Sequence, residues 1–292
     1  MAKRKLGLSL IVLIVAATTM VSGTYAWFLV GGFAELFDLG FEVIEAGGGI
    51  EIQGSAGHAH ATAEEGADQV EWGAYLNRDC FAAGELIAED GKYAPVSSAT
   101  GKDDFTKVGL EGGYFASLTP QVGVDYNEMR IKIRSTTTET VDARMNIALT
   151  GRDGENEAVS AARVSVTYKG TTTIFAMAGD TTYAVTSNDI SPATVMDSNN
   201  NSIIDQSEAQ GEVNLSAQTV TTLEQSEVDT NRFEATLDLP GVVANTGSGD
   251  EIIVRIWIEG NDTDCTGEKL SAKYLSAKIT FGSSSDTETE TP

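Results

Sequence analysis

The sequence is poor in the side chains that most enzymes use for catalysis. Its 292 residues include two histidines, His58 and His60, and two cysteines, Cys80 and Cys265. Two histidines separated by one residue cannot form the HExxH pair of a helical zinc site. The chain also lacks a G-x-S-x-G nucleophile elbow, a P-loop and a G-x-G-x-x-G turn. We therefore predict that the protein is not an enzyme and has no small-molecule substrate.

Basic residues are scarce as well. The chain has 19 Lys and Arg against 43 Asp and Glu, which gives a formal net charge of −24. A field of this sign repels nucleic acids and anionic membrane surfaces, so nucleic acid is excluded as a partner. The hydrophobic content of 41% nevertheless predicts a chain that folds around a core.

The two histidines form an H-x-H pair in a segment, 54–69, that is rich in Gly, Ala and Glu. Such a pair can chelate a metal ion. Three carboxylates lie nearby in the sequence: Glu64, Glu65 and Asp68. No third histidine or thiol lies close, so we favour a solvated loop over a metal site.

The N-terminus has the pattern of a secretory signal peptide. A basic Lys-Arg-Lys start is followed by an apolar stretch, 6–21, and by small residues at Thr24 and Ala26. These are the three regions that the export machinery and signal peptidase recognise. We predict that residues 1–26 are removed and that the mature protein begins at Trp27, outside the cell or on its surface.

Two other interpretations of this segment remain open. Residues 6–33 are apolar over enough length to span a membrane, since about 20 residues suffice, and would then tether a cell-surface binding module. A pilin-type leader cut after Gly7 would instead leave residues 8–30 as the core helix of a filament. All three interpretations export the bulk of the chain.

Export bears on the two cysteines, because an oxidising environment permits disulfides. A bond between Cys80 and Cys265 would close a long loop and stabilise the fold by roughly 4–5 kcal/mol in the chain-entropy model. The alternative is two buried thiols that are too far apart to join. The sequence leaves both open, and we include the disulfide among the expectations.

Residues 27–45 form an apolar arm that contains Gly31-Gly32. Residues 33–45 fit either a helix or an extended strand. An exposed arm of this composition is implausible in a soluble monomer, and burial of each large side chain contributes about 1.5–3 kcal/mol. The arm is therefore expected to enter its own core or that of a neighbouring copy. The side chains concerned are Trp27, Phe28, Leu29, Val30, Phe33, Leu36 and Phe37.

The rest of the chain alternates apolar and polar residues with a period of two. Met129, Ile131 and Ile133 face one way and charged residues the other, and similar short runs recur to Phe281. This pattern predicts a mostly β fold, an antiparallel β-sandwich of jelly-roll type with loop insertions and the apolar N-terminal arm. The expected boundaries are 46–282 for the sandwich, with an insertion around 190–210, and 283–292 for a disordered acidic tail.

Residues 197–208 match the spacing of an EF-hand loop, with oxygen side chains at positions 1, 3, 5, 9 and 12. Position 6 is Ser202 where that loop has glycine, and two asparagines replace aspartates, so we expect weak binding. No helix pair flanks the loop, which favours a structural ion, and an Asn/Asp-rich turn is the alternative. The predicted Ca²⁺ ligands are Asp197, Asn199, Asn201, Ile203 (through its carbonyl), Asp205 and Glu208.

Several segments resemble the TasA/camelysin family of secreted biofilm-matrix and surface fibre proteins. The leader ends in Gly-Thr-Tyr-Ala-Trp-Phe at 23–28, and the segment 253–265 reads Ile-Val-Arg-Ile-Trp-Ile-Glu-Gly followed by Asn-Asp-Thr-Asp-Cys. Pro-Val-Ser-Ser at 95–98, Phe105 and the strand at 129–135 also fall where such chains have similar stretches. Together these pieces cover about a third of the chain.

The resemblance implies a jelly-roll sandwich whose N-terminal arm is added as a strand to the next subunit, so that copies join head to tail in an open filament. Our leading hypothesis is therefore a secreted structural subunit of an extracellular filament, with copies of itself as partners. The alternatives are the pilin-like subunit and the membrane-anchored binding module.

We expect the protein recovered from outside the cell to begin at Trp27. Intact-mass measurement and N-terminal sequencing test this. A start at Leu8 would support the pilin-type leader, and a retained Met1 would support the anchor.

We expect Ca²⁺ to raise the melting temperature of the unmutated protein, and the double change Asp197→Ala and Glu208→Ala to abolish that rise. Asn200→Ala, at a position of the loop that supplies no ligand, is the matched control. Thermal melts with Ca²⁺ and with chelator measure the effect, and the absence of a calcium-dependent shift in the unmutated protein would refute the site.

Overall fold

A computed structural model describes residues 36–37, 39–41, 44–64, 67–88, 92–111, 114–151, 156–177, 183–190, 213–260, 262, 265, 270 and 275–284. The predicted leader, the arm up to residue 35, the calcium loop at 197–208 and the acidic tail from residue 285 lie outside these ranges. The predictions made for them stay predictions.

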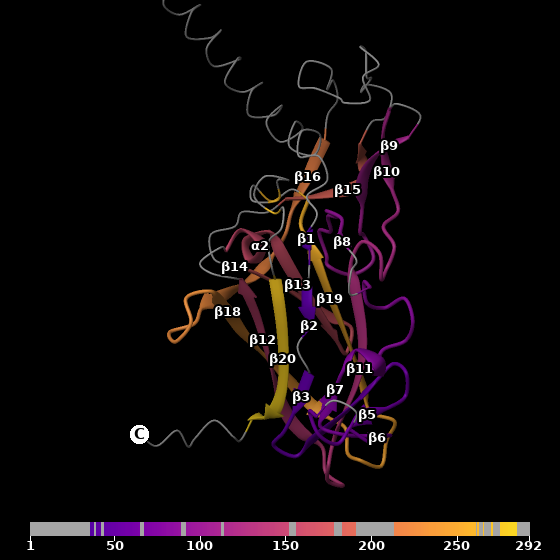
Figure 1. The fold of residues 1–292 in the computed structure, drawn as a ribbon, viewed down its shortest axis with the longest axis vertical. Helices are drawn as coiled ribbons and strands as arrows, with labels where there is room; N and C mark the ends of the chain where they lie inside the picture. The colour runs from indigo at the N-terminus through magenta and orange to yellow at the C-terminus, as the bar shows by residue number, and fades with distance from the viewer. Residues whose placement is uncertain are drawn as a thin grey trace, which may run out of the picture.

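The described chain is mostly β and is dominated by one mixed sheet of fourteen strands (Figure 1). In spatial order the strands are β4 (Ile50–Gly54), β11 (Asn127–Ser135), β19 (Asp250–Ile258), β13 (Ala162–Tyr168), β14 (Thr171–Met177), β17 (Val220–Gln225), β18 (Arg232–Val242), β12 (Val141–Gly151), β20 (Leu275–Ser283), β3 (Ile44–Ala46), β7 (Tyr75–Leu76), β5 (Ala59–His60) and β6 (Gln69–Val70), and β2 (Leu39–Phe41) also pairs with β20. Most pairs are antiparallel, but β14–β17, β2–β20 and β3–β20 are parallel.

Three two-stranded sheets and two short helical segments complete the described chain. The small sheets pair β1 (Leu36–Phe37) with β8 (Lys92–Tyr93), β9 (Lys107–Glu111) with β10 (Tyr114–Leu118), and β15 (Tyr183–Ile190) with β16 (Val213–Ala217). The helical segments are the 3₁₀ turn η1 (Arg78–Cys80) and α2 (Glu157–Ala161). The sequence pattern did not predict α2. Among the described residues no helix is both long and apolar enough to cross a membrane.

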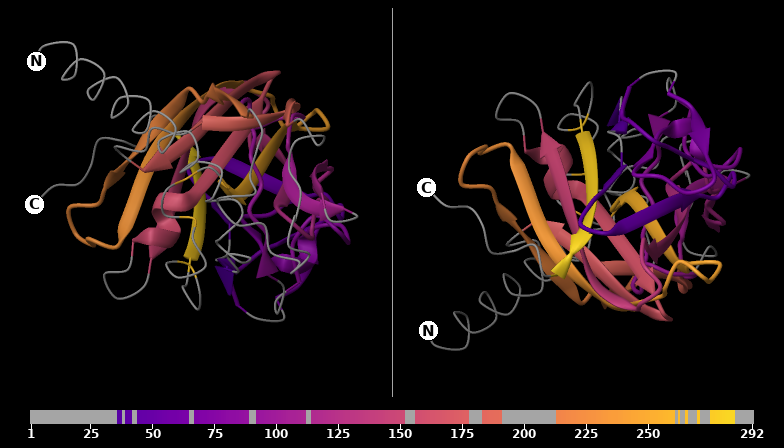
Figure 2. Two further views of the ribbon diagram at one scale, coloured as in Figure 1. Left: turned by 90° about the horizontal axis from the view of Figure 1, so that it is seen from above. Right: turned by 90° about the horizontal axis from the view of Figure 1, so that it is seen from below.

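The two ends of the large sheet meet. Ile52 of β4 exchanges backbone hydrogen bonds of 2.8 and 3.1 Å with Gly73, which lies two residues before β7. The orange β17–β18 hairpin and the purple segments before residue 100 lie on opposite sides of the molecule, with the indigo strands beside the yellow β20 between them (Figure 2). Side chains from β4, β11, β19, β13, β12 and β20 meet in one hydrophobic core.

The period-two pattern placed most of these strands correctly. In β11, Met129, Ile131 and Ile133 are fully buried, while Arg130 and Lys132 are exposed between them. β12 and β20 alternate in a similar way over part of their length, so each contributes one apolar face to the core. The prediction of a mostly β fold is confirmed, and the expectation of purely antiparallel pairing is corrected by the three parallel pairs.

The expectation of one polar face is wrong for β13 and for the second half of β19. There both faces are buried, because the segment 95–106 and the turn after β19 cover the outer side. Trp257 is fully buried on that side; its ring lies 5.1 Å from that of Phe105, which in turn stacks on Tyr126 at 4.3 Å. This second, smaller cluster also contains Val96 and Ile174.

The two-sided burial encloses an ion pair. The side chains of Arg163 in β13 and of Asp262 are 0% and 2% exposed, and their Nη2 and Oδ2 atoms lie 2.6 Å apart. The guanidinium also donates to the carbonyls of Ser160 and Ala162. The pair therefore fastens the turn after β19 onto the outer face of β13.

The N-terminal residues that are described lie in strands. β2 pairs parallel with β20 at Leu39 and Leu275, and β3 continues along the same strand at Glu45 and Thr280. The helical alternative for residues 33–45 is thus wrong for the described part of that range, and the extended alternative is correct there.

We expect Asp262→Ala to lower the free energy of unfolding by about 3–5 kcal/mol, because it leaves the Arg163 guanidinium buried without its carboxylate. The control is Arg144→Ala, which removes a pair with Asp238 of 3.2 Å whose carboxylate is 77% exposed, and should cost less than about 1 kcal/mol. Urea denaturation followed by circular dichroism compares the two variants. Equal losses would refute the special role of the buried pair.

Candidate metal centre

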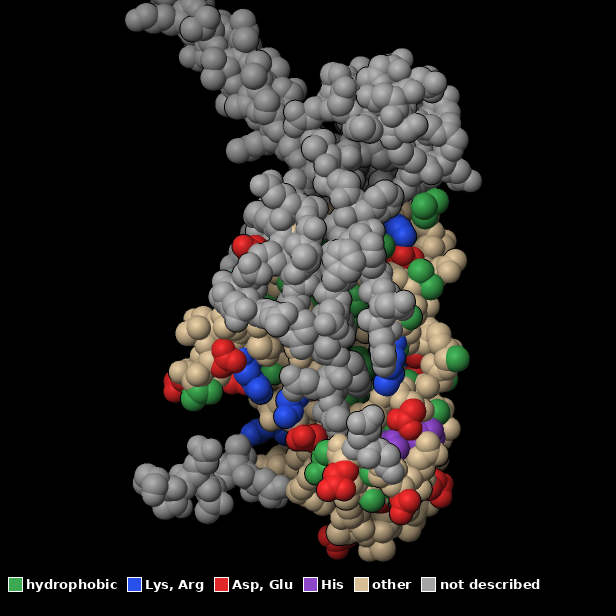
Figure 3. Space-filling view, in the orientation of Figure 1, with side chains coloured by type: hydrophobic (Ala, Val, Ile, Leu, Met, Phe, Trp, Pro, Cys, Tyr) green, Lys and Arg blue, Asp and Glu red, His purple; other side chains and the backbone are tan. Residues whose placement is uncertain are grey.

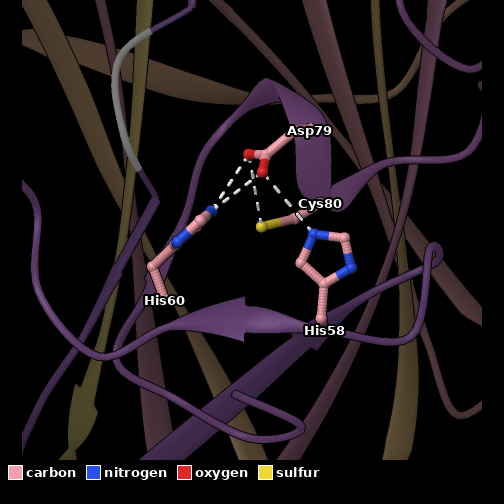
Figure 4. A group of neighbouring side chains, drawn as sticks. All are labelled: His58, His60, Asp79 and Cys80. Carbon is pink, nitrogen blue, oxygen red and sulfur yellow. Dashed lines mark hydrogen bonds and ion pairs between the residues drawn. The ribbon is translucent and has the colours of Figure 1, made fainter. Parts of the chain in front are cut away.

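Four side chains with metal-ligating atoms converge at the end of the sheet near β5 and η1. His58 and His60 come from β5 and the residue before it, and Asp79 and Cys80 come from η1 (Figure 4). The imidazole nitrogens, a carboxylate oxygen and the Cys80 sulfur all lie within 4.8 Å of one another. This is the only such group with three or more His, Cys, Asp or Glu residues among the described parts of the chain.

Close packing of backbone brings the two segments together. The amide of Ala56 donates to the carbonyl of Cys80 at 3.0 Å, and a Cβ added at Gly54 would lie 2.1 Å from that same carbonyl oxygen. A Cβ at Gly73 would lie 2.5 Å from the carbonyl oxygen of His60. A side chain at Gly54 would force β4 away from η1, and a side chain at Gly73 would force the segment before β7 away from β5, so both glycines are required for the close packing around the cluster.

His60 is the best-fixed member of the group. It is 4% exposed, and its Nε2 atom lies 3.0 and 3.1 Å from the two oxygens of Asp79. Its Nδ1 atom lies 3.1 Å from the carbonyl oxygen of Ala67. Both ring nitrogens are therefore positioned by oxygen atoms, and Asp79 is held further by Gln69, which donates to it at 3.2 Å.

His58 and Cys80 complete the group at longer distances. The Nε2 atom of His58 lies 3.6 Å from Oδ2 of Asp79, and the Cys80 sulfur lies 3.8 Å from Oδ1. Cys80 is fully buried, whereas the Asp79 side chain is half exposed. The cluster thus opens to solvent on the Asp79 side, and histidine side chains appear at the surface beside acidic ones (Figure 3).

The environment shifts two of the four titrating groups. Burial alone raises the pKa of Asp79, but the hydrogen bond and charge of His60, with help from Gln69 and His58, outweigh it and lower the pKa below its usual value. Burial raises the pKa of the Cys80 thiol to about 11; a backbone hydrogen bond involving Asn77 opposes this shift and the Asp79 charge adds to it. Without a metal ion, the group at neutral pH contains a carboxylate and a protonated thiol.

The structure groups the predicted residues differently from the sequence analysis. The H-x-H pair meets Asp79 and Cys80 in place of Glu64 and Asp68, both of which are exposed outside the cluster; Glu65 and the calcium ligands lie outside the described residues. The adjacent Asp79-Cys80 was a usable signal, because it puts two ligand types in one short turn, but nothing in the sequence brings it to residue 58.

Cys80 and Cys265 are both free and buried in the structure. Cys80 lies beside Asp79, whereas the amide of Cys265 donates to the carbonyl of Asp262 at 3.1 Å, next to the buried Arg163 pair. The structure thus holds them as two separate buried thiols and does not form the expected disulfide.

Comparison of the chain with protein-family models, with curated proteins and with solved structures finds no match. Among the described residues, the segments that resemble parts of the TasA/camelysin sequences lie side by side. Val96 exchanges backbone hydrogen bonds of 3.0 and 2.9 Å with Ile258 and Gly260, and Phe105 contacts Trp257. The strand at 129–135 pairs with β19 directly.

Proposed function

We propose that this chain is a secreted structural subunit that assembles head to tail into an extracellular filament, by adding its N-terminal arm as a strand to the sheet of the next copy. The observation that carries the proposal is β2. The first described residues of the 27–45 arm lie in strands, and one of these, β2, extends the large sheet along β20. An arm that leads directly into a sheet strand has the backbone direction and period needed for strand addition.

The arm residues adjacent to β2 also begin a pairing of their own. Leu36 and Phe37 form β1, which pairs with β8 at Tyr93 and Lys92. Leu36, Phe37 and the residues of β2 therefore follow the extended alternative of the sequence analysis. A strand presents apolar side chains on alternate positions, so that an extended arm offers rows of them to a core.

The large sheet also offers an edge that can receive a strand. Within the described residues, β17 pairs with β18 only at Phe233 and Glu234, so β18 has no partner on that side over residues 235–239. Beyond residue 239 the edge of β18 is no longer open, because the Tyr168 hydroxyl donates a hydrogen bond of 3.2 Å to the carbonyl of Pro240. The open stretch spans about 16 Å at ~3.3 Å per residue.

The side chains along this edge match an apolar donor. Leu237 and Ala235 point toward the core and pack against it, yet both are only partly buried, whereas Leu239 further along is fully buried. An incoming strand with large apolar side chains would finish their burial. The run Trp27-Phe28-Leu29-Val30 supplies such side chains, and each contributes about 1.5–3 kcal/mol on burial.

We also propose how the strands are arranged in layers and which family the chain belongs to. We take the large mixed sheet to be a jelly-roll-type sandwich, in which β14 and β18 are neighbouring edges of the two layers. The contacts among 95–98, Phe105, 129–135 and β19 support membership of the TasA/camelysin family, since the described segments with the resemblance meet at β19. The pilin-like alternative depends on residues 8–30, outside the described ranges.

We expect deletion of residues 27–35 from the mature protein to abolish filaments while leaving a folded monomer, because β1, β2 and β3 remain. Electron microscopy and light scattering measure assembly, and circular dichroism measures folding. Filaments formed by the deleted protein would refute the donated arm.

Leu237→Arg should block assembly from the receiving side, because a charge in the groove opposes burial of an apolar strand. Thr236→Arg adds the same charge on the opposite, exposed face of β18 and is the matched control. When mixed with unmutated protein, Leu237→Arg subunits should still donate their arm to an unmutated subunit but accept none. They should therefore stop filament growth and shorten the filaments. Equal assembly by the two variants would refute this edge as the acceptor.

A further inference from the structure

We propose that His58, His60, Asp79 and Cys80 bind one divalent transition-metal ion of the zinc class. This inference does not rest on the proposed filament, because it concerns side chains within one subunit. The site differs from the predicted calcium loop in position, in ligand chemistry and in the ion that it would take.

The orientation of the His60 ring is the first support. Its Nδ1 faces the carbonyl oxygen of Ala67, which can only accept, so Nδ1 must carry the proton. The Nε2 atom faces the Asp79 carboxylate, 3.0 Å from Oδ1, so this nitrogen and the carboxylate point at the same space. A cation there would be bound by Nε2 and Asp79 together, and a backbone carbonyl on the other nitrogen is the usual support of a metal-bound histidine.

The second support comes from His58. Its Nε2 atom is buried and has no hydrogen-bond partner, although Asp79 Oδ2 lies 3.6 Å away. A buried nitrogen without a partner destabilises the fold, because it has lost its hydrogen bonds to water. A metal ion bound beside Asp79 would give this nitrogen a partner together with the Nε2 atom of His60.

The spacing of the ligand atoms fits a tetrahedral ion. Zn–N and Zn–O bonds of about 2.0–2.2 Å and a Zn–S bond of about 2.3 Å put neighbouring ligand atoms roughly 3.3–3.8 Å apart. The Asp79 oxygens lie 3.0, 3.6 and 3.8 Å from the ligand atoms of His60, His58 and Cys80. All members lie within 4.8 Å of one another, so shifts of about 1 Å complete the geometry.

The donor set selects the class of metal. Two imidazoles, a thiol and one carboxylate suit zinc and similar ions, whereas calcium and magnesium require mainly oxygen ligands. Binding replaces the Cys80 S–H bond with a sulfur–metal bond and releases the proton to solvent, so no oxidant or reductant is needed. The half-exposed Asp79 provides the route by which the ion enters.

The ion would join two segments that the backbone already holds close. His58 and His60 belong to the chain around β5, and Asp79 and Cys80 belong to η1 just after β7. Both lie beside the Ile52–Gly73 contact that joins the two ends of the sheet. Metal binding should therefore stabilise the folded state by mass action, and the melting temperature should rise with metal concentration.

The test uses the full mature protein after dialysis against a chelator. We expect calorimetry to show saturable binding of one Zn²⁺ per chain and Co²⁺ to give a thiolate-to-metal charge-transfer band. Cys80→Ser should abolish that band, and Cys265→Ser, which changes the other buried cysteine, should retain it. His58→Gln, which tests the site at a partly exposed position, should raise the dissociation constant at least about tenfold.

Circular dichroism establishes that each variant is folded. Retention of the Co²⁺ band in a folded Cys80→Ser variant would overturn the proposal, whatever the result for Cys265→Ser. Unchanged Zn²⁺ affinity in a folded His58→Gln, or no saturable binding by the unmutated protein, would overturn it as well. Calcium-loop variants carrying Asp197→Ala and Glu208→Ala should bind Zn²⁺ normally, which separates the two sites.

Discussion

The structure depends on the burial of the second half of β19 on both of its faces. β19 lies between β11 and β13, and its inward side chains Ile252, Val254 and Ile256 join the main core. In its second half the outward side chains are Arg255 and Trp257, and they are buried as well, under the segment 95–106. A strand covered on both sides cannot leave polar groups to water, so each polar group in the outer layer needs a partner within the protein.

That requirement accounts for the polar network of the outer layer. Arg255 contacts Glu128 at 2.7 Å, and the Trp257 indole and Gln218 both donate to Glu259, at 3.1 and 2.8 Å. The C-terminal motif Arg-Ile-Trp-Ile-Glu-Gly thus places its arginine, tryptophan and glutamate in one buried layer. In this chain the motif serves packing and hydrogen bonding, and its conformation fixes where the following turn lies.

Sequence periodicity predicted the strands because alternation is a local property. Each strand from β11 to β20 that the alternation predicted is present, since one buried face is enough to impose a period of two. The same pattern says nothing about what covers the other face. Arg163 lies in a Val-rich strand, and its partner Asp262 is 99 residues away along the chain, so a local pattern could not show that this arginine is buried.

The metal-ligating cluster also could not be predicted from a local sequence pattern. The H-x-H pair was visible, but Asp79 lies 19 residues beyond His60, and the contact depends on two glycines whose role is purely steric. In the sequence Gly54 and Gly73 look like ordinary loop residues. In the structure a backbone carbonyl oxygen lies so close to each of them that a Cβ atom would clash with it. Close approach of backbones depends on the tertiary arrangement, so the ligand set could be assembled only in three dimensions.

The two proposals meet at β3. This strand pairs with β20 on one side, in line with β2, and with β7 on the other. β7 pairs with β5, whose His60 is the best-fixed residue of the cluster. Tension on an arm that is held by a neighbouring copy would be transmitted through β2 and β3 to their partner strands β20 and β7.

A metal ion that joins β5 to η1 would stabilise β7 at this end of the sheet. The strands here are only two or three residues long and supply few backbone hydrogen bonds. The region that most needs reinforcement in a filament is therefore the one that carries the ligands.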